Sequence, residues 1–231
     1  MKTLGIIGGM SPESTVSYYQ IINREVNRRL GGNSSADIVM HSVNFETVAA
    51  MQRAGDWAGA GGMLAQSAQK LERMGAQALV LATNTMHKVA PAIEAAAGIS
   101  LIHVVDATAA AVQAAGLEKV ALLGTRFTMS DGFYTRRMQD LGVETVVPSE
   151  SVQHEIHRII FEELCRNRFT EAAKRDYLHA IGQLQAQGAQ GVIFGCTEIG
   201  LLLKPEDCPL PVFDSAAIHA LAAVDFALSD M

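Results

Sequence analysis

The sequence predicts an α/β protein made of two similar domains, each a four-stranded parallel sheet flanked by helices. Short apolar runs alternate with longer amphipathic stretches along nearly all of the 231 residues, which is typical of βαβ units. The apolar runs are continuous, as in strands that are covered on both faces of a parallel sheet. The alternation also falls into two blocks that resemble each other.

Eight strands are expected from the apolar runs. They are 2–7, 37–43, 77–82, 100–104, 119–123, 144–147, 190–195 and 211–213. Helical patterns fill most of the gaps between these runs. They are 12–30, 57–74, 85–97, 105–115, 127–141, 149–166, 169–187 and 214–229.

The two blocks share a glycine turn and a polar strand end at similar spacing. In the first block, the opening strand ends at Gly8 and the third strand runs into Thr83. In the second block, the corresponding positions are Gly124 and Cys196. This repeat indicates two similar halves.

We place the first half at residues 1–115 and the second at residues 116–213. Ligands of open α/β sheets bind beyond the carboxyl ends of the strands. If the two halves face each other, Thr83 and Cys196 lie on opposite walls of one cleft. We therefore expect the active site in a cleft between the two domains.

The composition predicts a buried core and excludes several classes of partner. Apolar residues make up 49% of the chain and charged residues 18%, which favours a substantial core. The net charge of -6 argues against a nucleic-acid partner, because such proteins carry a basic surface. No apolar run has the length of a transmembrane helix or of a secretory signal, so we expect no membrane partner and a cytoplasmic location.

The three cysteines indicate free thiols, since an odd and small number does not make a disulfide framework. Cys165 lies inside the apolar pattern "IIFEELC" and is interpreted as a small buried residue. Cys208, in "DCPLP", is expected in a loop. Cys196 alone follows a strand and opens a helix, where the helix N-terminus is expected to lower the pKa of the thiol toward neutrality.

The first glycine turn, "GGMSPES", opens a helix with a capping Ser11 and with Pro12 at the first helical position. Backbone N–H groups at such an N-terminus bind anions, and the same argument applies after Thr83 and Cys196. Each turn alone is equally explained as an ordinary strand-to-helix turn, but their clustering favours a ligand with carboxylates. The turn lacks the spacing of a dinucleotide fingerprint, so we expect no such site.

No metal site or cofactor site is predicted. His154 and His157 lie three residues apart on an expected helix, but the sequence places no third ligand with them. A solvated helix face is the preferred interpretation of this pair. No Schiff-base lysine context was found for pyridoxal phosphate.

Five pieces of the chain together resemble the aspartate/glutamate racemase family, whose members do not use pyridoxal phosphate. They are "GIIGGMSPEST", "TNTMHK", "LLGTRFT", "FEEL" and "FGCTEIGLLL". The resemblance implies two pseudo-symmetric α/β domains, a homodimer, and a C-terminal helix, 214–231, that packs on the first half. It also implies a small acidic amino acid as the substrate.

The resemblance further implies one catalytic residue from each half. The second is Cys196 within "GCTE", while the first, usually a cysteine before "N-T-x-H", is Thr83 here. The family's arginine after the second strand is missing or displaced to Arg53. Its lysine after "EEL" is absent, with Arg166 and Arg168 nearby.

The implied reaction is cofactor-independent interconversion of L- and D-aspartate and/or glutamate. Cys196 and Thr83 would act on opposite faces of Cα, each at about 3–3.5 Å. A threonine hydroxyl is a weak acid and a weak base, so Thr83 needs help, for example from His87. Arg126 is our first choice to pair with a substrate carboxylate. The residues expected to bind the substrate are Met10, Ser11, Gln52, Asn84, Thr85, Thr125, Arg126, Thr128, Thr197 and Glu198.

Two alternatives stay open from the sequence. One is another enzyme of the same superfamily, such as a cis–trans isomerase or a decarboxylase that acts on a small dicarboxylate. The other is a ligand-binding protein that kept the cleft and lost one base, which the threonine at position 83 allows.

Overall fold

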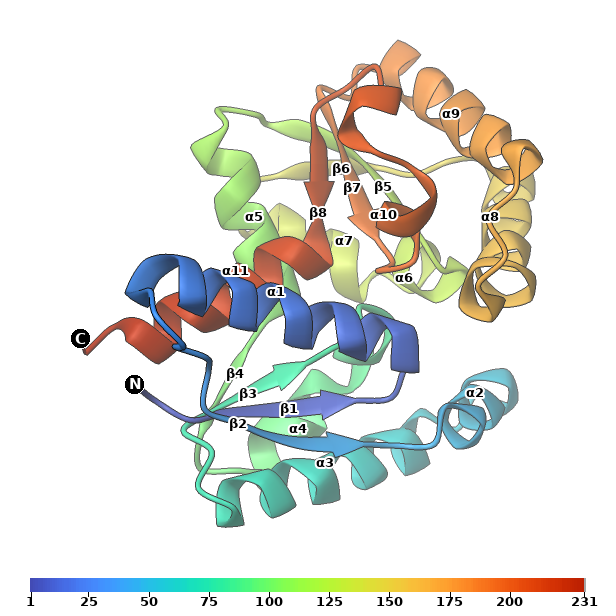
Figure 1. The fold of residues 1–231 in the computed structure, drawn as a ribbon. Helices are drawn as coiled ribbons and strands as arrows, with labels where there is room; N and C mark the ends of the chain where they lie inside the picture. Colours follow the sequence, from blue (N-terminus) through green and yellow to red (C-terminus); the bar gives the residue numbers. More distant parts are fainter. Residues whose placement is uncertain (231) are drawn as a thin grey trace. The chain divides into compact units, whose positions relative to one another are not determined.

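The computed structural model describes residues 1–230, which form two compact units (Figure 1). Unit 1 contains residues 1–103 together with the chain from His219 onward, and unit 2 contains residues 104–218. Each unit carries one four-stranded parallel sheet flanked by helices. The predicted architecture is thereby confirmed.

The sheet of unit 1 has the order β2-β1-β3-β4. Its strands are β1 (Leu4–Gly8), β2 (Ile38–Ser42), β3 (Ala78–Leu81) and β4 (Ser100–Ile102). The chain passes from β1 outward to β2 and then crosses back to β3 on the other side of β1. The strand order therefore reverses between β1 and β3, where Ile7 lies opposite Leu81.

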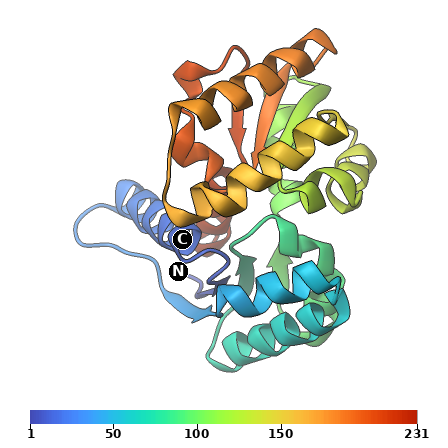
Figure 2. The same cartoon turned by 90° about the vertical axis from the view of Figure 1, so that its right-hand side faces the viewer.

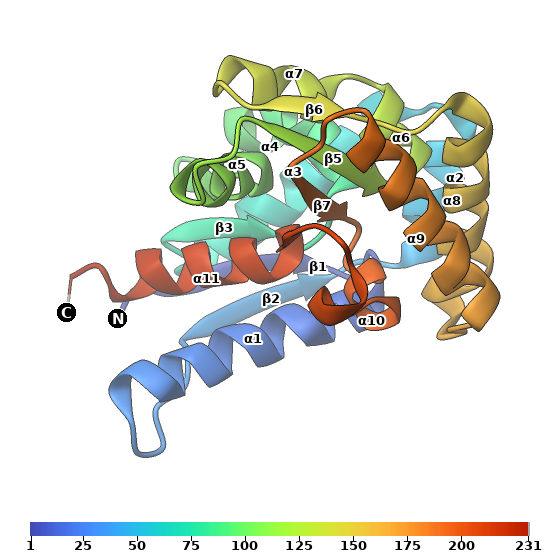
Figure 3. The same cartoon turned by 90° about the horizontal axis from the view of Figure 1, so that it is seen from above.

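Helices cover both faces of this sheet. They are α1 (Pro12–Leu30), α2 (Phe45–Ala54), α3 (Trp57–Arg73), the 3-10 helix η1 (Thr85–Val89), α4 (Ala90–Ala96) and most of α11 (Ser215–Leu228). Leu64, Met86 and Ile93, from α3, η1 and α4, pack with Ile7 and Leu81 in one core. Figure 3 shows α1 and α11 along the opposite face.

The sheet of unit 2 repeats this topology with the order β6-β5-β7-β8. Its strands are β5 (Lys119–Gly124), β6 (Glu144–Val146), β7 (Gly191–Gly195) and β8 (Val212–Asp214). The order reverses between β5 and β7, where Gly124 lies opposite Gly195. The equivalent strands therefore occupy equivalent places in both units.

Alternate residues of β5 and β7 point to opposite faces of the sheet and pack in two different cores. Leu123 and Phe194 pack against the pair of helices α8 (Glu150–Glu162) and α9 (Glu171–Ala186), which lie across the front of the second sheet in Figure 2. Leu122 and Ile193 face the helices α5 (Val104–Ala114) and α7 (Phe133–Asp140). Burial on both faces explains why these strands read as continuous apolar runs.

The remaining elements of unit 2 are short. They are α6 (Arg126–Ser130), η2 (Leu164–Arg166), α10 (Ile199–Leu202) and η3 (Pro205–Asp207). The pattern at 127–141 predicted one helix, but the structure has two, α6 and α7. Gly132 separates them with a left-handed φ of 75°, a conformation that ends a helix readily at glycine.

Two further features differ from the prediction. Helix α2 falls in a segment for which no helix was expected, and Asn44 begins it by accepting a hydrogen bond from the Glu46 N–H at 3.0 Å. Helix α5 was assigned to the first half, 1–115, but it packs against α7 and β8 within unit 2. The boundary therefore lies at residues 103 and 104.

The C-terminal helix contributes to unit 1 from His219 onward. The Lys2 N–H donates to the Ala227 carbonyl at 2.9 Å, and the Lys2 ammonium lies over the Phe226 ring. Residue 231, the last of the segment 214–231, lies outside the described residues. No helix within residues 1–230 is long and apolar enough to span a membrane.

A close backbone approach fixes the reversal point of unit 2. A Cβ atom on Gly124 would lie 2.8 Å from the Gly195 carbonyl oxygen and 3.2 Å from the Thr128 Cβ. Neither neighbour is the flexible end of a long side chain, so the strand has no room for a larger residue. The helical Gly182, in α9, has open space where a Cβ would stand.

We predict that Gly124→Ala lowers the free energy of unfolding by about 1–3 kcal/mol, because the new methyl group overpacks the β5–β7 contact. Gly182→Ala is the matched control and should raise the free energy of unfolding by about 0.5–1 kcal/mol. Chemical denaturation of both variants gives the comparison. A neutral effect of Gly124→Ala would show that the strands separate easily at this point.

Candidate functional site

The predicted site residues gather at the two points where the strand order reverses. Ligands of such sheets bind at these points, beyond the carboxyl ends of the strands. In unit 1, the chain leaves β1 at Gly8 and β3 just before Thr83. In unit 2, it leaves β5 at Gly124 and β7 just before Cys196. Each unit therefore has one candidate corner.

In the unit 1 corner, the first turn of α1 is tied to the end of β3. The Ser11 side chain caps α1 by accepting from the Ser14 N–H at 3.2 Å. The Ser14 hydroxyl donates to the Ala82 carbonyl at 3.2 Å, and the Gly9 N–H donates to the Thr15 hydroxyl at 2.7 Å. These bonds hold the glycine turn beside the residue that precedes Thr83.

Thr83 is buried and its backbone is held by His87. The Nδ1 atom of His87 lies 2.8 Å from the Thr83 carbonyl oxygen, so Nδ1 must carry the hydrogen in this bond. The sequence suggested that His87 assists the Thr83 hydroxyl. The structure instead directs this nitrogen to the backbone carbonyl.

His87 belongs to a group of three buried histidines in unit 1. Its ring centroid lies 4.6 Å from that of His103 and 5.6 Å from that of His219. The Nε2 atom of His219 donates to the Ile102 carbonyl at 2.7 Å, and its Nδ1 atom accepts from the Tyr18 hydroxyl at 2.9 Å. Burial lowers the pKa of His219 to about 4, so this ring is neutral near pH 7.

Gln52 brings a buried amide to the same corner from α2. Its Nε2 atom lies 3.1 Å from the Met86 sulfur, and its Oε1 atom has no hydrogen-bond partner within residues 1–230. An unsatisfied buried acceptor is costly, and it is available to a donor on a ligand. Met10, Asn84 and Thr85 are also buried in unit 1.

In the unit 2 corner, the Cys196 thiol meets a carboxylate. The Cys196 sulfur lies 3.0 Å from the Glu198 Oε2 atom, which also accepts from the Thr197 hydroxyl at 2.7 Å. Cys196 and Glu198 are buried, with exposed fractions of 8% and 3%. Glu198 was predicted as a substrate-binding residue, and the structure shows that its side chain is directed to the thiol.

The expected lowering of the Cys196 pKa is wrong. Burial raises the pKa of this thiol well above its usual range, and the negative charge of Glu198 raises it further. Helix α10 has four residues and begins only at Ile199, so it supplies too short a dipole to oppose these effects. The resting form is therefore the neutral thiol, with Glu198 as the group that accepts its hydrogen bond.

The end of β5 supplies a second turn to the unit 2 corner. Thr125 caps α6 by accepting from the Thr128 N–H at 3.3 Å, and the hydroxyls of these two residues lie 3.2 Å apart. The Arg126 N–H donates to the His157 Nδ1 atom at 3.2 Å. Burial and then the charge of Arg126 lower the pKa of His157, which agrees with Nδ1 acting as an acceptor.

The four arginines considered for substrate binding have different surroundings. Arg53 forms an ion pair with Glu46 on the same helix, so its charge is already matched. Arg126, Arg166 and Arg168 are exposed and form no ion pair within the described part of the chain. Of these three, Arg126 alone directly follows a strand at a reversal point.

The other predicted residues do not form a second reactive site. All three cysteines are free thiols, and Cys165 and Cys208 are partly buried against the core of unit 2. His154 is exposed, as the predicted solvated face requires, but His157 is half-buried and packs against Phe161. In the stretch 1–230, no group of three or more His, Cys, Asp or Glu side chains is arranged to hold a metal ion.

The sequence did not predict the side chains that contact the main residues of each corner. Glu198 was predicted only as a substrate-binding residue, although "C-T-E" contains the thiol and the carboxylate that meet at 3.0 Å. Tyr18 and His219 come from helices far apart in sequence and carry no local motif. Only the packing of α1 and α11 reveals them.

Comparison with known proteins gives consistent results. A family model described as Asp/Glu/Hydantoin racemase matches residues 7–223. The broad-specificity amino-acid racemase RacX of Bacillus subtilis (strain 168) is 24% identical over 224 residues, which is 96% of each chain.

Solved structures resemble the chain over nearly its full length. A candidate Asp/Glu racemase from Yersinia pestis is 48% identical with a TM-score of 0.92, covering 99% of this chain and 100% of that one. An aspartate racemase homologue from Pyrococcus horikoshii OT3 is 35% identical with a TM-score of 0.84, covering 98% and 99%.

The buried His219 generates a prediction about pH. Its pKa is lowered to about 4 in the folded protein, so the unfolded chain binds the extra proton first as the pH falls. Its contribution to stability is therefore complete above about pH 6.5 and is lost between about pH 6.5 and pH 4. Between about pH 7.5 and pH 5, the wild type should lose about 2 kcal/mol more than His219→Gln.

The fluorescence of Trp57, the single tryptophan of the chain, reports urea denaturation of unit 1. His154→Gln, at an exposed position in unit 2, is the control and should keep the wild-type pH dependence. An unchanged pH dependence in His219→Gln would mean that His219 is not held neutral by burial.

Proposed function

We propose a specific reaction from one premise: the chain belongs to the Asp/Glu/Hydantoin racemase family, and is an isomerase. The proposed reaction is the interconversion of L- and D-aspartate and/or glutamate without a cofactor. Cys196 and Thr83 are proposed as the acid/base groups on the two faces of the substrate Cα.

One observation carries this proposal: Cys196 directly follows β7, and its thiol lies 3.0 Å from a buried carboxylate. Removal of a weakly acidic Cα proton needs a base, and a neutral thiol becomes one only if its proton has an acceptor. Glu198 is in place to be that acceptor. In this step the S–H bond of Cys196 breaks, an O–H bond forms on Glu198, and the negative charge moves to sulfur.

Thr83 is proposed for the opposite face because it holds the equivalent place in the repeated topology. The proposal requires both residues to approach one Cα, each at about 3–3.5 Å. The bond from His87 to the Thr83 carbonyl supports a rigid position for this residue. A hydroxyl is a much weaker acid than a thiol, so the two faces are expected to react at unequal rates.

The remaining site residues are proposed to hold the substrate. Arg126 is proposed to pair with a carboxylate, because it is exposed beside a reversal point; Arg53 is the weakest choice because of its pairing with Glu46. The free acceptor of Gln52 suits the substrate ammonium group. The other proposed contacts are Met10, Ser11, Asn84, Thr85, Thr125, Thr128, Thr197 and Glu198, with backbone N–H groups stabilising charge that develops on the substrate carboxylate.

The relatives also bear on substrate range and assembly. The Bacillus subtilis relative is a broad-specificity racemase, so neutral amino acids belong in the assay beside aspartate and glutamate. We propose a homodimer in the cytoplasm, supported by the family resemblance and, for the compartment, by three free thiols. Light scattering of the purified protein tests the dimer.

We predict that Cys196→Ala abolishes racemisation, with a loss of at least about 10²–10⁴-fold in kcat, because one acid/base group is removed. Chiral chromatography of D- and L-aspartate and glutamate, with chelator present and no pyridoxal phosphate added, measures the activity. Cys208→Ala removes a thiol that the proposed reaction does not use and should keep wild-type activity. Racemisation by Cys196→Ala near the wild-type rate would sink the mechanism.

We predict that Thr83→Val separates proton exchange from inversion. In D₂O, Cys196 should still remove the Cα proton of one enantiomer and return deuterium to the same face. That enantiomer should gain deuterium and keep its configuration, while the other gains none. Mass spectrometry after chiral separation distinguishes these products, and loss of exchange from both enantiomers would contradict a single base at Cys196.

Thr83→Cys tests the same assignment by restoring the thiol that the family usually carries. Since enantiomers have equal free energy in water, the kcat/KM values of the two directions must match in every variant. We therefore expect the wild type to have unequal kcat values that are matched by unequal KM values. Thr83→Cys should raise kcat most in the slower direction, and equal wild-type kcat values would show that Thr83 has another role.

A further inference from the structure

Tyr177 carries a buried hydroxyl in the core of unit 2. The side chain projects from α9 and has no exposed surface. Its hydroxyl has no hydrogen-bond partner among residues 1–230. A phenylalanine would fill the same space without this unsatisfied group, which typically costs about 1–3 kcal/mol. The hydroxyl therefore calls for a reason other than stability.

The surroundings of this hydroxyl point to the Cys196 corner. Tyr177 and Cys196 belong to the same core, which also contains Leu164 and Ile199. Burial raises the pKa of the Tyr177 hydroxyl most, and the charges of Cys196, Glu198, Cys165 and Glu163 raise it further, in that order. These four acids lie in the turn after β7, at the end of α8 and in η2, so the hydroxyl lies within the electrostatic reach of all three segments.

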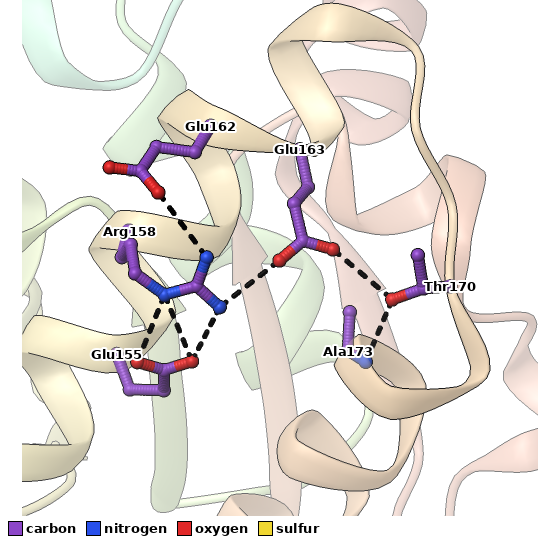
Figure 4. A network of polar contacts seen from close by, with 6 residues as sticks. All are labelled: Glu155, Arg158, Glu162, Glu163, Thr170 and Ala173. Carbon is purple, nitrogen blue, oxygen red and sulfur yellow. Dashed lines mark hydrogen bonds and ion pairs between the residues drawn. The ribbon is translucent and has the colours of Figure 1, made fainter.

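The charge of Glu163 is already compensated. Arg158 donates to one Glu163 oxygen at 3.0 Å, and the Thr170 hydroxyl donates to the other at 3.1 Å (Figure 4). The same guanidinium group also pairs with Glu155 and Glu162. The Cys196–Glu198 pair is buried in the same unit, and its charge acts on the Tyr177 hydroxyl more strongly than that of Glu163 does.

Tyr177 remains a donor under all conditions in which Cys196 acts. Burial raises the pKa of the Tyr177 hydroxyl well above its usual range, and the charges of Cys196 and Glu198 add to this effect. A protonated phenol can direct its O–H bond to either of two positions in the plane of the ring. In a buried site of low dielectric, such a dipole stabilises a nearby negative charge more strongly than it does in water.

We propose that Tyr177 is a positioning residue whose O–H group turns toward the charge of the Cys196–Glu198 pair and stabilises the state in which sulfur is the thiolate. The inference rests on the proposed function, because it explains how a thiol with a carboxylate neighbour becomes a base. Tyr177 touches neither substrate nor the reacting carbon. It acts only through Cys196.

The test compares Tyr177→Phe with Tyr134→Phe. Tyr134 is equally buried in unit 2, but its hydroxyl faces Thr108 in the core on the other side of the sheet. Two readouts are used for each variant. The first is the rate of iodoacetamide alkylation at Cys196 against pH, followed by peptide mass spectrometry, which requires no turnover. The second is the pH profile of racemisation.

In Tyr177→Phe, the alkylation midpoint of Cys196 should rise by about one pH unit, and kcat near pH 7 should fall about tenfold with little change in KM. Its Tm should not fall, because the lost hydroxyl has no partner. Tyr134→Phe should leave the midpoint and kcat at their wild-type values. An unchanged midpoint in Tyr177→Phe, or an equal shift in both variants, overturns the inference.

The two readouts separate this inference from the proposed function. If the wild type racemises no amino acid but Tyr177→Phe still shifts the alkylation midpoint, the proposed reaction fails and the role of Tyr177 toward the thiolate stands. If the wild type racemises aspartate or glutamate and Tyr177→Phe matches it in both readouts, the inference alone fails.

Discussion

The reversal of strand order between two neighbouring parallel strands is the constraint on which both corners depend. Because β1 and β3 lead their helices in opposite directions, their carboxyl ends leave a space that no connection crosses. The same holds for β5 and β7, where Gly124 and Gly195 bring the backbones into close approach. This geometry delivers a polar side chain, Thr83 or Cys196, to the same place in each unit. The side chains placed there then decide the chemistry.

Thr83 and Cys196 have different electrostatic surroundings. Around Thr83, His87 donates to a carbonyl, and burial keeps His219 uncharged near pH 7 between a phenol and a second carbonyl. Such surroundings suit a hydroxyl that never ionises in water. Around Cys196, a carboxylate lies against a thiol in a buried site. Those surroundings suit a group that must exchange its proton.

Much of the fold was predictable because the local sequence pattern of each element agrees with its place in the sheet. Buried strands read as continuous apolar runs, and the glycine turns marked both reversal points. Helix α2 was missed because it is short and buries only Val48, Ala49 and Gln52, and an asparagine cap rather than a strong apolar stripe begins it. The placement of α5 was missed because a boundary between units depends on which sheet a helix packs against. That choice is made by contacts with α7 and β8, which come later in the chain.

For the candidate site, the positions of the main residues were predictable, but their electrostatic surroundings were not. The motif residues at strand ends were visible, since strand ends are local in sequence. The expected lowering of the Cys196 pKa was wrong because burial and the charge of Glu198 both raise it. The motif "C-T-E" contains Glu198, but neither the burial of the thiol nor the direction of the Glu198 side chain can be read from it, and the helix that follows has only four residues.

The repeat therefore preserves backbone positions while leaving the chemistry free to diverge. The Thr83 corner is supported from α11, which enters unit 1 only after the whole of unit 2 has been formed by the chain. The Cys196 corner is supported from α9, the helix that leads into its own strand β7. These two helices hold different places in the repeat, because α11 follows the last strand of its block whereas α9 precedes the third, so His219 and Tyr177 are not equivalent positions. A duplicated topology with unmatched supporting helices allows a hydroxyl to replace a thiol in one half without disturbing the sheet in either.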